Sequence, residues 1–159
     1  MNAPESVRAI LVEGKIPYNE VPDSFPLTIA VDPAHLHAMV TYLHQHPGVY
    51  FDHLTNITGI DNGPSANTME VIYHLYSIPF HYSLALKVVL SRESPEVESL
   101  TGIWKSANWL EREVFDMFGI RFKNHPDLRR ILMPHDWQGF PLRKDYQQQE
   151  MYHEVKVAY

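Results

Sequence analysis

Three carboxylates surround one arginine in the stretch WLEREVFD: Glu111, Glu113 and Asp116, with Arg112 among them. Two carboxylates whose surroundings separate their pKa values can act as general acid and general base, so one hypothesis is a stand-alone hydrolase. In a helix, however, Glu111 and Glu113 lie roughly 200° apart and cannot face one substrate. Arg112 and Asp116 are spaced to meet as helical neighbours. The pattern favours an ion-paired helix that faces solvent or a partner, and we predict no catalytic residue.

Histidine pairs are the second candidate site. The chain has ten histidines, and two pairs, His35 with His37 and His44 with His46, are each separated by one residue. Residues two apart on a helix do not share a face, and the H-E-x-x-H pattern of zinc hydrolases is absent. We therefore expect structural or surface histidines and predict no metal site.

Cofactor signals are also missing from these 159 residues. The cysteine count is zero, which excludes disulfides, thiolate nucleophiles, Cys-ligated zinc and Cys-ligated iron–sulfur clusters within this polypeptide. The sequence contains no G-x-G-x-x-G and no P-loop, and no serine lies in a nucleophile elbow. We predict no cofactor-binding residue in this chain.

Membranes and nucleic acids are both disfavoured as direct partners. The first residues lack the basic and apolar regions of a signal peptide, and no run of about 18 apolar residues is present. Any membrane association is therefore expected to be indirect. The net charge of −6 and the pI near 5.9 argue against nucleic-acid binding.

The hydrophobic spacing predicts six elements that would form the scaffold. They are a strand over 27–31, a helix over 33–46, strands over 50–61, 69–78 and 82–90, and a helix over 106–118. The last two strands are close enough in sequence for an antiparallel hairpin. We expect residues 1–120 to form one α+β domain of two layers, with a four-stranded, mainly antiparallel or mixed sheet and helices on one face.

The stripe of apolar residues on each helix indicates its buried side. The first helix carries Leu36, Met39, Val40 and Leu43 at helical spacing, and the second carries Ala107, Leu110, Val114, Met117 and Phe118. Asp32 with Pro33 predicts the start of the first helix, and Ser106 and Gly119 predict the ends of the second.

The sequence RRILMPHDWQGFPLRKDY (129–146) combines apolar and cationic side chains with two prolines. Pro134 and Pro141 exclude a long helix or a central strand. From Arg121 to Lys144 there are six Lys/Arg against two Asp, so the remainder of the chain carries a charge of −10. We predict that 121–159 is an extended, partner-docking C-terminal arm. The alternative is a tail that folds back over its own sheet.

These motifs give the chain a long and ordered resemblance to one family. The helix motif W-x-E-R-E-x-x-D-x-x-G is followed by F-x-x-H-P-x-L-x-R-I-L and then by W-x-G-x-P-L-R-K-D-Y. In this order they resemble the signature of the C subunit of the proton-pumping NADH–quinone oxidoreductase, respiratory complex I. The signature residues that we expect to position or dock the chain are Trp109, Glu111, Arg112, Glu113, Asp116, His125, Arg129, Arg130, Trp137, Gly139, Pro141, Arg143, Lys144, Asp145 and Tyr146.

The resemblance implies a non-catalytic structural or assembly subunit of the peripheral arm, on the cytoplasmic face of the bacterial inner membrane. It implies packing on the D subunit, which holds the quinone site, with neighbouring cluster-bearing subunits as further partners. FMN, iron–sulfur clusters and quinone would belong to other subunits, and the enzyme activity would belong to the assembly. Energy-converting hydrogenases and the plastid-type complex use similar subunits, so they stay as alternatives.

Overall fold

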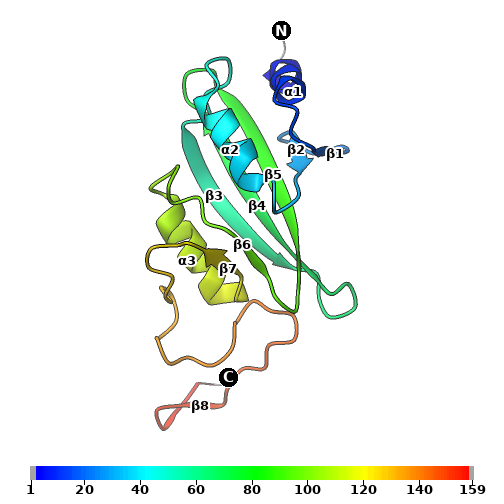
Figure 1. Ribbon diagram of the computed structural model, residues 1–159. Coiled ribbons are helices and arrows are strands. Elements are labelled where there is room, and N and C mark those ends of the chain that lie inside the picture. Colours follow the sequence, from blue (N-terminus) through cyan, green and yellow to red (C-terminus); the bar gives the residue numbers. More distant parts are fainter. Residues whose placement is uncertain (1–2, 158–159) are drawn as a thin grey trace.

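The computed structural model describes residues 3–157, in which three helices and nine strands form (Figure 1). The helices are α1 (Ala3–Glu13), α2 (Leu36–Gln45) and α3 (Ala107–Phe118). The strands are β1 (Asn19–Val21), β2 (Thr28–Ala30), β3 (His53–Asp61), β4 (Thr68–Ser77), β5 (Tyr82–Ser91), β6 (Glu96–Glu98), β7 (Arg121–Lys123), β8 (Met151–Tyr152) and β9 (Val155–Lys156).

A five-stranded mixed sheet of order β1-β2-β5-β4-β3 forms the centre of the fold. The predicted hairpin is present, since β4 and β5 pair antiparallel from Thr68↔Ser91 to Ser77↔Tyr82. Strand β2 joins this hairpin parallel to β5, and β1 adds an antiparallel edge. The sheet is therefore mixed, which is one of the two forms that the sequence predicted, but it has five strands rather than four.

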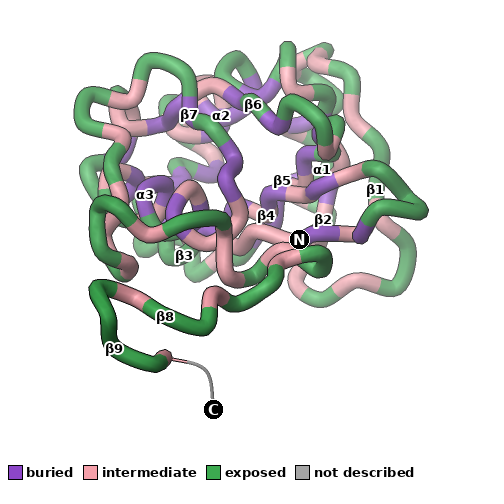
Figure 2. The backbone as a smooth tube through the Cα atoms, turned by 90° about the horizontal axis from the view of Figure 1, so that it is seen from below, coloured by how far each residue is buried: buried purple, intermediate pink, exposed green. Residues whose placement is uncertain are grey.

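The helices α2 and α3 cover the apolar face of the sheet. Alternate residues of β4 are buried, among them Val71 and Tyr73. Gly59 pairs with Val71 across the sheet and so shares its face, and there it meets Val114 and Phe118 of α3. The predicted stripe of α2 is fully buried. Figure 2 shows the buried backbone in the middle of the molecule, with the β8–β9 hairpin at its periphery.

Two predictions about the helices need correction. Helix α2 begins at Leu36 rather than at Pro33, because Asp32 accepts a hydrogen bond from the Ala34 main chain and holds the preceding residues in a turn. In α3 only Ala107 and Val114 of the predicted stripe are fully buried. Three charged residues of α3 are buried as well, which an apolar stripe does not predict: Glu111, Arg112 and Asp116.

Several short elements escaped the sequence analysis. Strands β6 and β7 pair in parallel, with Val97 opposite Phe122. The sequence analysis predicted no strand at β6 and placed the start of the arm at β7. Each strand buries only its middle residue, so three residues give too little alternation to recognise. Helix α1 buries Val7 and Leu11 but was not predicted at all.

The prediction that 121–159 extends away from the domain is wrong up to Tyr146. Residues 121–123 are strand β7, and 128–146 fold back across α3 and reach the end of β3 (Figure 1). The following β8–β9 hairpin lies at one end of the fold (Figure 1), where Tyr152 and His153 hydrogen-bond to Asp136. The chain thus folds back, as the alternative expected, but over α3 rather than over the sheet. Docking to a partner stays a prediction.

The contact between β3 and α3 gives a test of this packing. A Cβ atom at Gly59 would lie 2.6 Å from the Phe118 ring and 3.1 Å from Val114. We expect Gly59→Ala to lower the free energy of unfolding by about 1–3 kcal/mol, because α3 must move away from the sheet. Denaturant unfolding of the isolated chain measures this. Gly102→Ala is the matched control, since nothing lies within 4 Å of its Cβ position; equal stability of the two variants would contradict the packing.

Candidate functional site

The buried carboxylate of Asp116 fixes the segment that follows β7. Asp116 lies on α3 and is fully buried. Its Oδ2 accepts hydrogen bonds from three successive main-chain N–H groups, those of Ile131, Leu132 and Met133, at 3.0, 2.7 and 2.8 Å. Its Oδ1 accepts one from Arg130 Nη1 at 2.7 Å. We call residues 128–146, which cross α3 in this way, the clamped segment.

These hydrogen bonds keep Asp116 ionised inside the protein. Burial alone opposes ionisation, but the main-chain donors at Met133, Ile131 and Leu132 together with Arg130 outweigh it, so the pKa of Asp116 is lowered. Arg130 also donates to the Gly139 carbonyl at 2.8 Å. One carboxylate and one guanidinium therefore hold both ends of the stretch 130–139.

Arg112 holds the same segment without a carboxylate. Its Nε and Nη2 donate to the carbonyls of Arg129 and Arg130 at 3.2 and 3.3 Å, and its guanidinium lies 5.4 Å from the centroid of the Trp109 ring. The predicted pairing of Arg112 with Asp116 along the helix is absent from the described contacts. The arginine that pairs with Asp116 is instead Arg130, which lies on the clamped segment rather than on α3.

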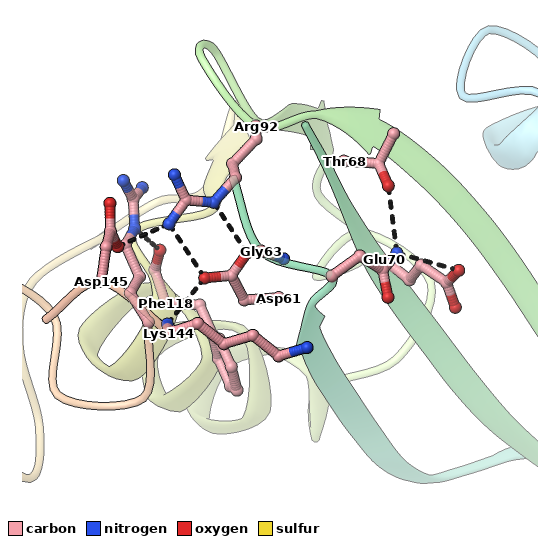
Figure 3. A network of polar contacts seen from close by, with 10 residues as sticks. Asp61, Gly63, Thr68, Glu70, Arg92, Phe118, Lys144 and Asp145 are labelled. Carbon is pink, nitrogen blue, oxygen red and sulfur yellow. Dashed lines mark hydrogen bonds and ion pairs between the residues drawn. The ribbon is translucent and has the colours of Figure 1, made fainter. Parts of the chain in front are cut away.

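A second carboxylate, Asp61 at the end of β3, fastens the end of the clamped segment (Figure 3). Arg92 binds both of its oxygens, at 2.8 and 3.0 Å, and also binds Asp145. The Lys144 N–H donates to Asp61 Oδ2 at 2.8 Å. The Arg92 hydrogen bonds hold the pKa of Asp61 far below its usual range, against the effect of burial.

Between the two carboxylates, Phe140 and Arg143 seal the end of α3. Gly119 ends the helix with φ +73°, as predicted, and a Cβ atom there would lie 2.5 Å from the Phe140 ring. Arg143 Nε donates to the Phe118 carbonyl at 2.6 Å, and its guanidinium lies 4.8 Å from the Phe140 centroid. Both side chains are thus used within the chain itself.

Glu111 forms a separate buried site at the start of α3. Its two oxygens accept hydrogen bonds from the Leu100 N–H and the Ser99 hydroxyl, both at 2.7 Å. Burial raises the pKa of Glu111 to about 7, against these hydrogen bonds. His125 Nε2 lies 3.9 Å from Glu111 Oε2. Glu113 is exposed, so the structure does not bring the two glutamates together for acid–base chemistry.

The hydrogen bonds of His125 assign its tautomer. Its Nδ1 accepts from the Asp127 N–H at 3.0 Å, so the ring proton lies on Nε2, which donates to the Asn108 carbonyl at 3.1 Å. His125 therefore links the turn that precedes the clamped segment to α3.

The remaining predicted residues also contact their own chain. The Trp137 indole N–H donates to the Tyr146 hydroxyl at 3.0 Å, and the Tyr146 ring packs against Gly139. Arg129 is exposed and pairs with Asp127 at 2.9 Å. Pro141 is half-buried, and the side chain of Lys144 is exposed.

Exposed apolar side chains gather at this site, and only one of them, Trp109, was among the predicted docking residues. Trp109, Leu132 and Leu142 are 64%, 61% and 55% exposed, and they lie on α3 or on the clamped segment. Leu132 and Leu142 were not among the predicted docking residues. Each of them lies beside residues that anchor the clamped segment, Ile131 and Met133 for Leu132 and Arg143 for Leu142.

Within residues 3–157, no three His, Asp or Glu side chains are placed to hold a metal ion. No helix in this part of the chain is both long and apolar enough to cross a membrane.

The fold and this site define a class of protein: an α+β scaffold whose buried charges hold a C-terminal segment against a helix. The chain belongs to the family described as "Respiratory-chain NADH dehydrogenase, 30 Kd subunit", which matches residues 29–152. This confirms the family resemblance that the signature residues carried.

Relatives and a solved structure agree with this family. The chain is 46% identical over 117 residues to a C subunit of NADH-quinone oxidoreductase from Rhizobium etli, covering 74% of this chain but only 62% of that protein. It is 44% identical to the C subunit from Moorella thermoacetica, covering 82% of this chain and 86% of that protein. The solved trypsin-resistant fragment of Nqo5 is 28% identical, with a TM-score of 0.63, over 80% of this chain and all of the fragment.

The anchor at Asp116 predicts a large loss of stability on its removal. Asp116→Ala would remove the acceptor of three main-chain N–H groups and the buried carboxylate that pairs with Arg130, and we expect about 3–5 kcal/mol of destabilisation. The control is Asp127→Ala, which removes an exposed ion pair with Arg129 and should cost less than about 0.5 kcal/mol. Denaturant unfolding of both variants checks the difference; similar losses would contradict the anchor.

The raised pKa of Glu111 predicts a pH-dependent stability. A group with a folded pKa of about 7 and an ordinary pKa of 4.5 contributes stability that is fully present below about pH 4.5. This contribution is lost as the pH rises through 7, by up to about 3 kcal/mol. Unfolding free energies from pH 5 to 8 should therefore fall less steeply for Glu111→Gln than for the natural chain. Parallel profiles would show that Glu111 does not titrate in this range.

Proposed function

We propose that this chain is a structural subunit of the peripheral arm of NADH–quinone oxidoreductase, and that it packs on the D subunit, which holds the quinone site. The observation that carries the proposal is the exposed apolar group Trp109, Leu132 and Leu142. Trp109 lies on α3, and the two leucines lie on the segment that two buried carboxylates hold in place. The printed names of the relatives support the assembly to which it belongs. The chain itself supplies the surface.

Rigidity makes this surface suitable for docking. Exposed apolar groups on a fixed backbone bury area on contact without losing main-chain freedom, so the entropic cost of association is small. The anchors at Asp116 and Asp61 supply that fixed backbone. Arg130 and Arg143, which were predicted to position or dock the chain, support the docking face from within.

The chemistry of the assembly would then lie outside this chain. We assign FMN, the iron–sulfur clusters and quinone to other subunits, including cluster-bearing neighbours, and we assign no catalytic residue here. The zero cysteine count and the internal use of Asp116, Glu111 and Arg130 support this division. Attachment to the membrane would be indirect, on its cytoplasmic face. An energy-converting hydrogenase or a plastid-type complex is the alternative assembly for the same docking role.

The exposed apolar group gives a direct test of docking. The double substitution Leu132→Ser and Leu142→Ser should leave the stability of the isolated chain nearly unchanged, because both side chains are exposed. It should, however, reduce the amount of chain recovered with the solubilised oxidoreductase by about tenfold or more, because apolar contact area is lost. Affinity purification from membranes followed by protein quantification measures this recovery.

The matched control is Val12→Ser on α1, which is 68% exposed and lies outside the clamped segment. We expect this variant to be recovered like the natural chain. Full recovery of the double variant would place the docking face elsewhere. Recovery with a hydrogenase rather than with NADH-oxidising subunits would select the alternative assembly.

A further inference from the structure

A groove beside the exposed Trp109 is lined by arginines as well as by apolar side chains, and docking by apolar contact alone does not explain these arginines. The groove has a volume of about 550 Å³ between α3 and the clamped segment. Its apolar part includes Trp109, Phe115 and Ile131, and its polar part includes Arg112, Arg129 and His135. None of its lining residues is an aspartate or a glutamate. The groove is therefore lined by aromatic, aliphatic and cationic groups.

Arg112 is the unusual member of this lining. It is only 9% exposed, yet its hydrogen bonds go to two carbonyl oxygens, and no carboxylate lies within 4 Å of it among the ion pairs of residues 3–157. The other two arginines of the groove are compensated, Arg129 by Asp127 and Arg130 by Asp116. A nearly buried guanidinium without a counter-charge is costly, so the groove lacks one negative charge.

We propose that this groove binds a carboxylate from an acidic segment of a partner polypeptide, with Arg112 as its main ligand. The guanidinium already lies beside the Trp109 ring, so an aspartate or glutamate could meet it at the mouth of the groove while a neighbouring apolar side chain packs on Trp109. Arg129, whose side chain is 72% exposed and pairs only with the exposed Asp127, would be a second cationic contact for the same segment. A carboxylate is the occupant that fits, because arginines but no aspartate or glutamate line the groove.

This inference rests on the proposed docking function and adds the identity of the partner's recognition group. It also explains why a chain with a net charge of −6 presents a local surface of the opposite sign. Charged groups around an apolar contact determine which partner binds and how fast it binds, and carboxylate recognition would thereby complement the apolar face of Leu132 and Leu142.

The test uses the assembled oxidoreductase in membranes that carry variants of this chain. Arg112→Gln keeps a donor near the position of Nε, which bonds the Arg129 carbonyl, but removes the charge. After solubilisation, we expect this variant to dissociate from the assembly at least about tenfold more readily than the natural chain, as measured by the fraction retained after washes of rising salt concentration. Arg112→Lys should retain an intermediate amount, because it keeps the charge but loses the planar fork.

A second variant keeps the test informative if Arg112→Gln weakens the fold. Arg129→Glu changes an exposed side chain, and it should give the same direction of loss. The control Arg121→Glu changes an equally exposed arginine of β7 outside the groove and should be retained normally. Melting of each isolated variant separates loss of binding from loss of folding.

The outcomes distinguish this inference from the docking proposal. Normal retention of Arg129→Glu and Arg112→Gln, with loss of the Leu132/Leu142 double variant, would overturn carboxylate recognition but keep the docking face. Normal retention of all three would overturn both. Binding of the isolated natural chain to vesicles with anionic phospholipid, abolished by Arg112→Gln, would assign the groove to a lipid headgroup and would also overturn the inference.

Discussion

The ionised carboxylate of Asp116 inside the protein is the interaction on which the rest of the site depends. A buried charge needs compensation, and here four hydrogen bonds provide it from residues 130–133, which come after α3 in sequence. The carboxylate can be buried only if the chain returns across the helix in one particular path. The buried carboxylate of Asp61 likewise accepts a hydrogen bond from the Lys144 N–H, so the chain must also pass beside the end of β3. Two charges therefore determine the course of a segment that has no helix or strand of its own.

This course determines what the protein can present to a partner. Side chains that serve as anchors are turned towards α3 and β3, whereas Trp109, Leu132 and Leu142 are exposed. Arg112 has both roles. It supports the segment by donating to two carbonyl oxygens, and it has no carboxylate partner among the described ion pairs, so its charge is available to a partner. A protein that presents a fixed apolar and charged surface to a partner fits this arrangement. The docking partner is the part of this account that we propose.

Sequence patterns predicted the parts of the fold that repeat regularly. The helix α2 and the hairpin β4–β5 follow from apolar spacing, because a long periodic element buries many residues in one register. The short strands β6 and β7 and the buried Glu111 did not follow, because each depends on contacts between distant residues. The signature residues identified the family. Arg130 and Arg143 were expected to position or dock the chain, and tertiary contacts show that both support their own chain. Their docking to a partner stays a prediction.

Amide hydrogen exchange of the isolated chain at Ile131, Leu132 and Met133 tests the central claim most directly. If Asp116 holds these three N–H groups, they should exchange as slowly as the main-chain amides in the middle of α3 at neutral pH, although they lie in irregular structure. Exchange at the rate of an unstructured peptide would show that the segment is not clamped before a partner binds, and the account would then be wrong.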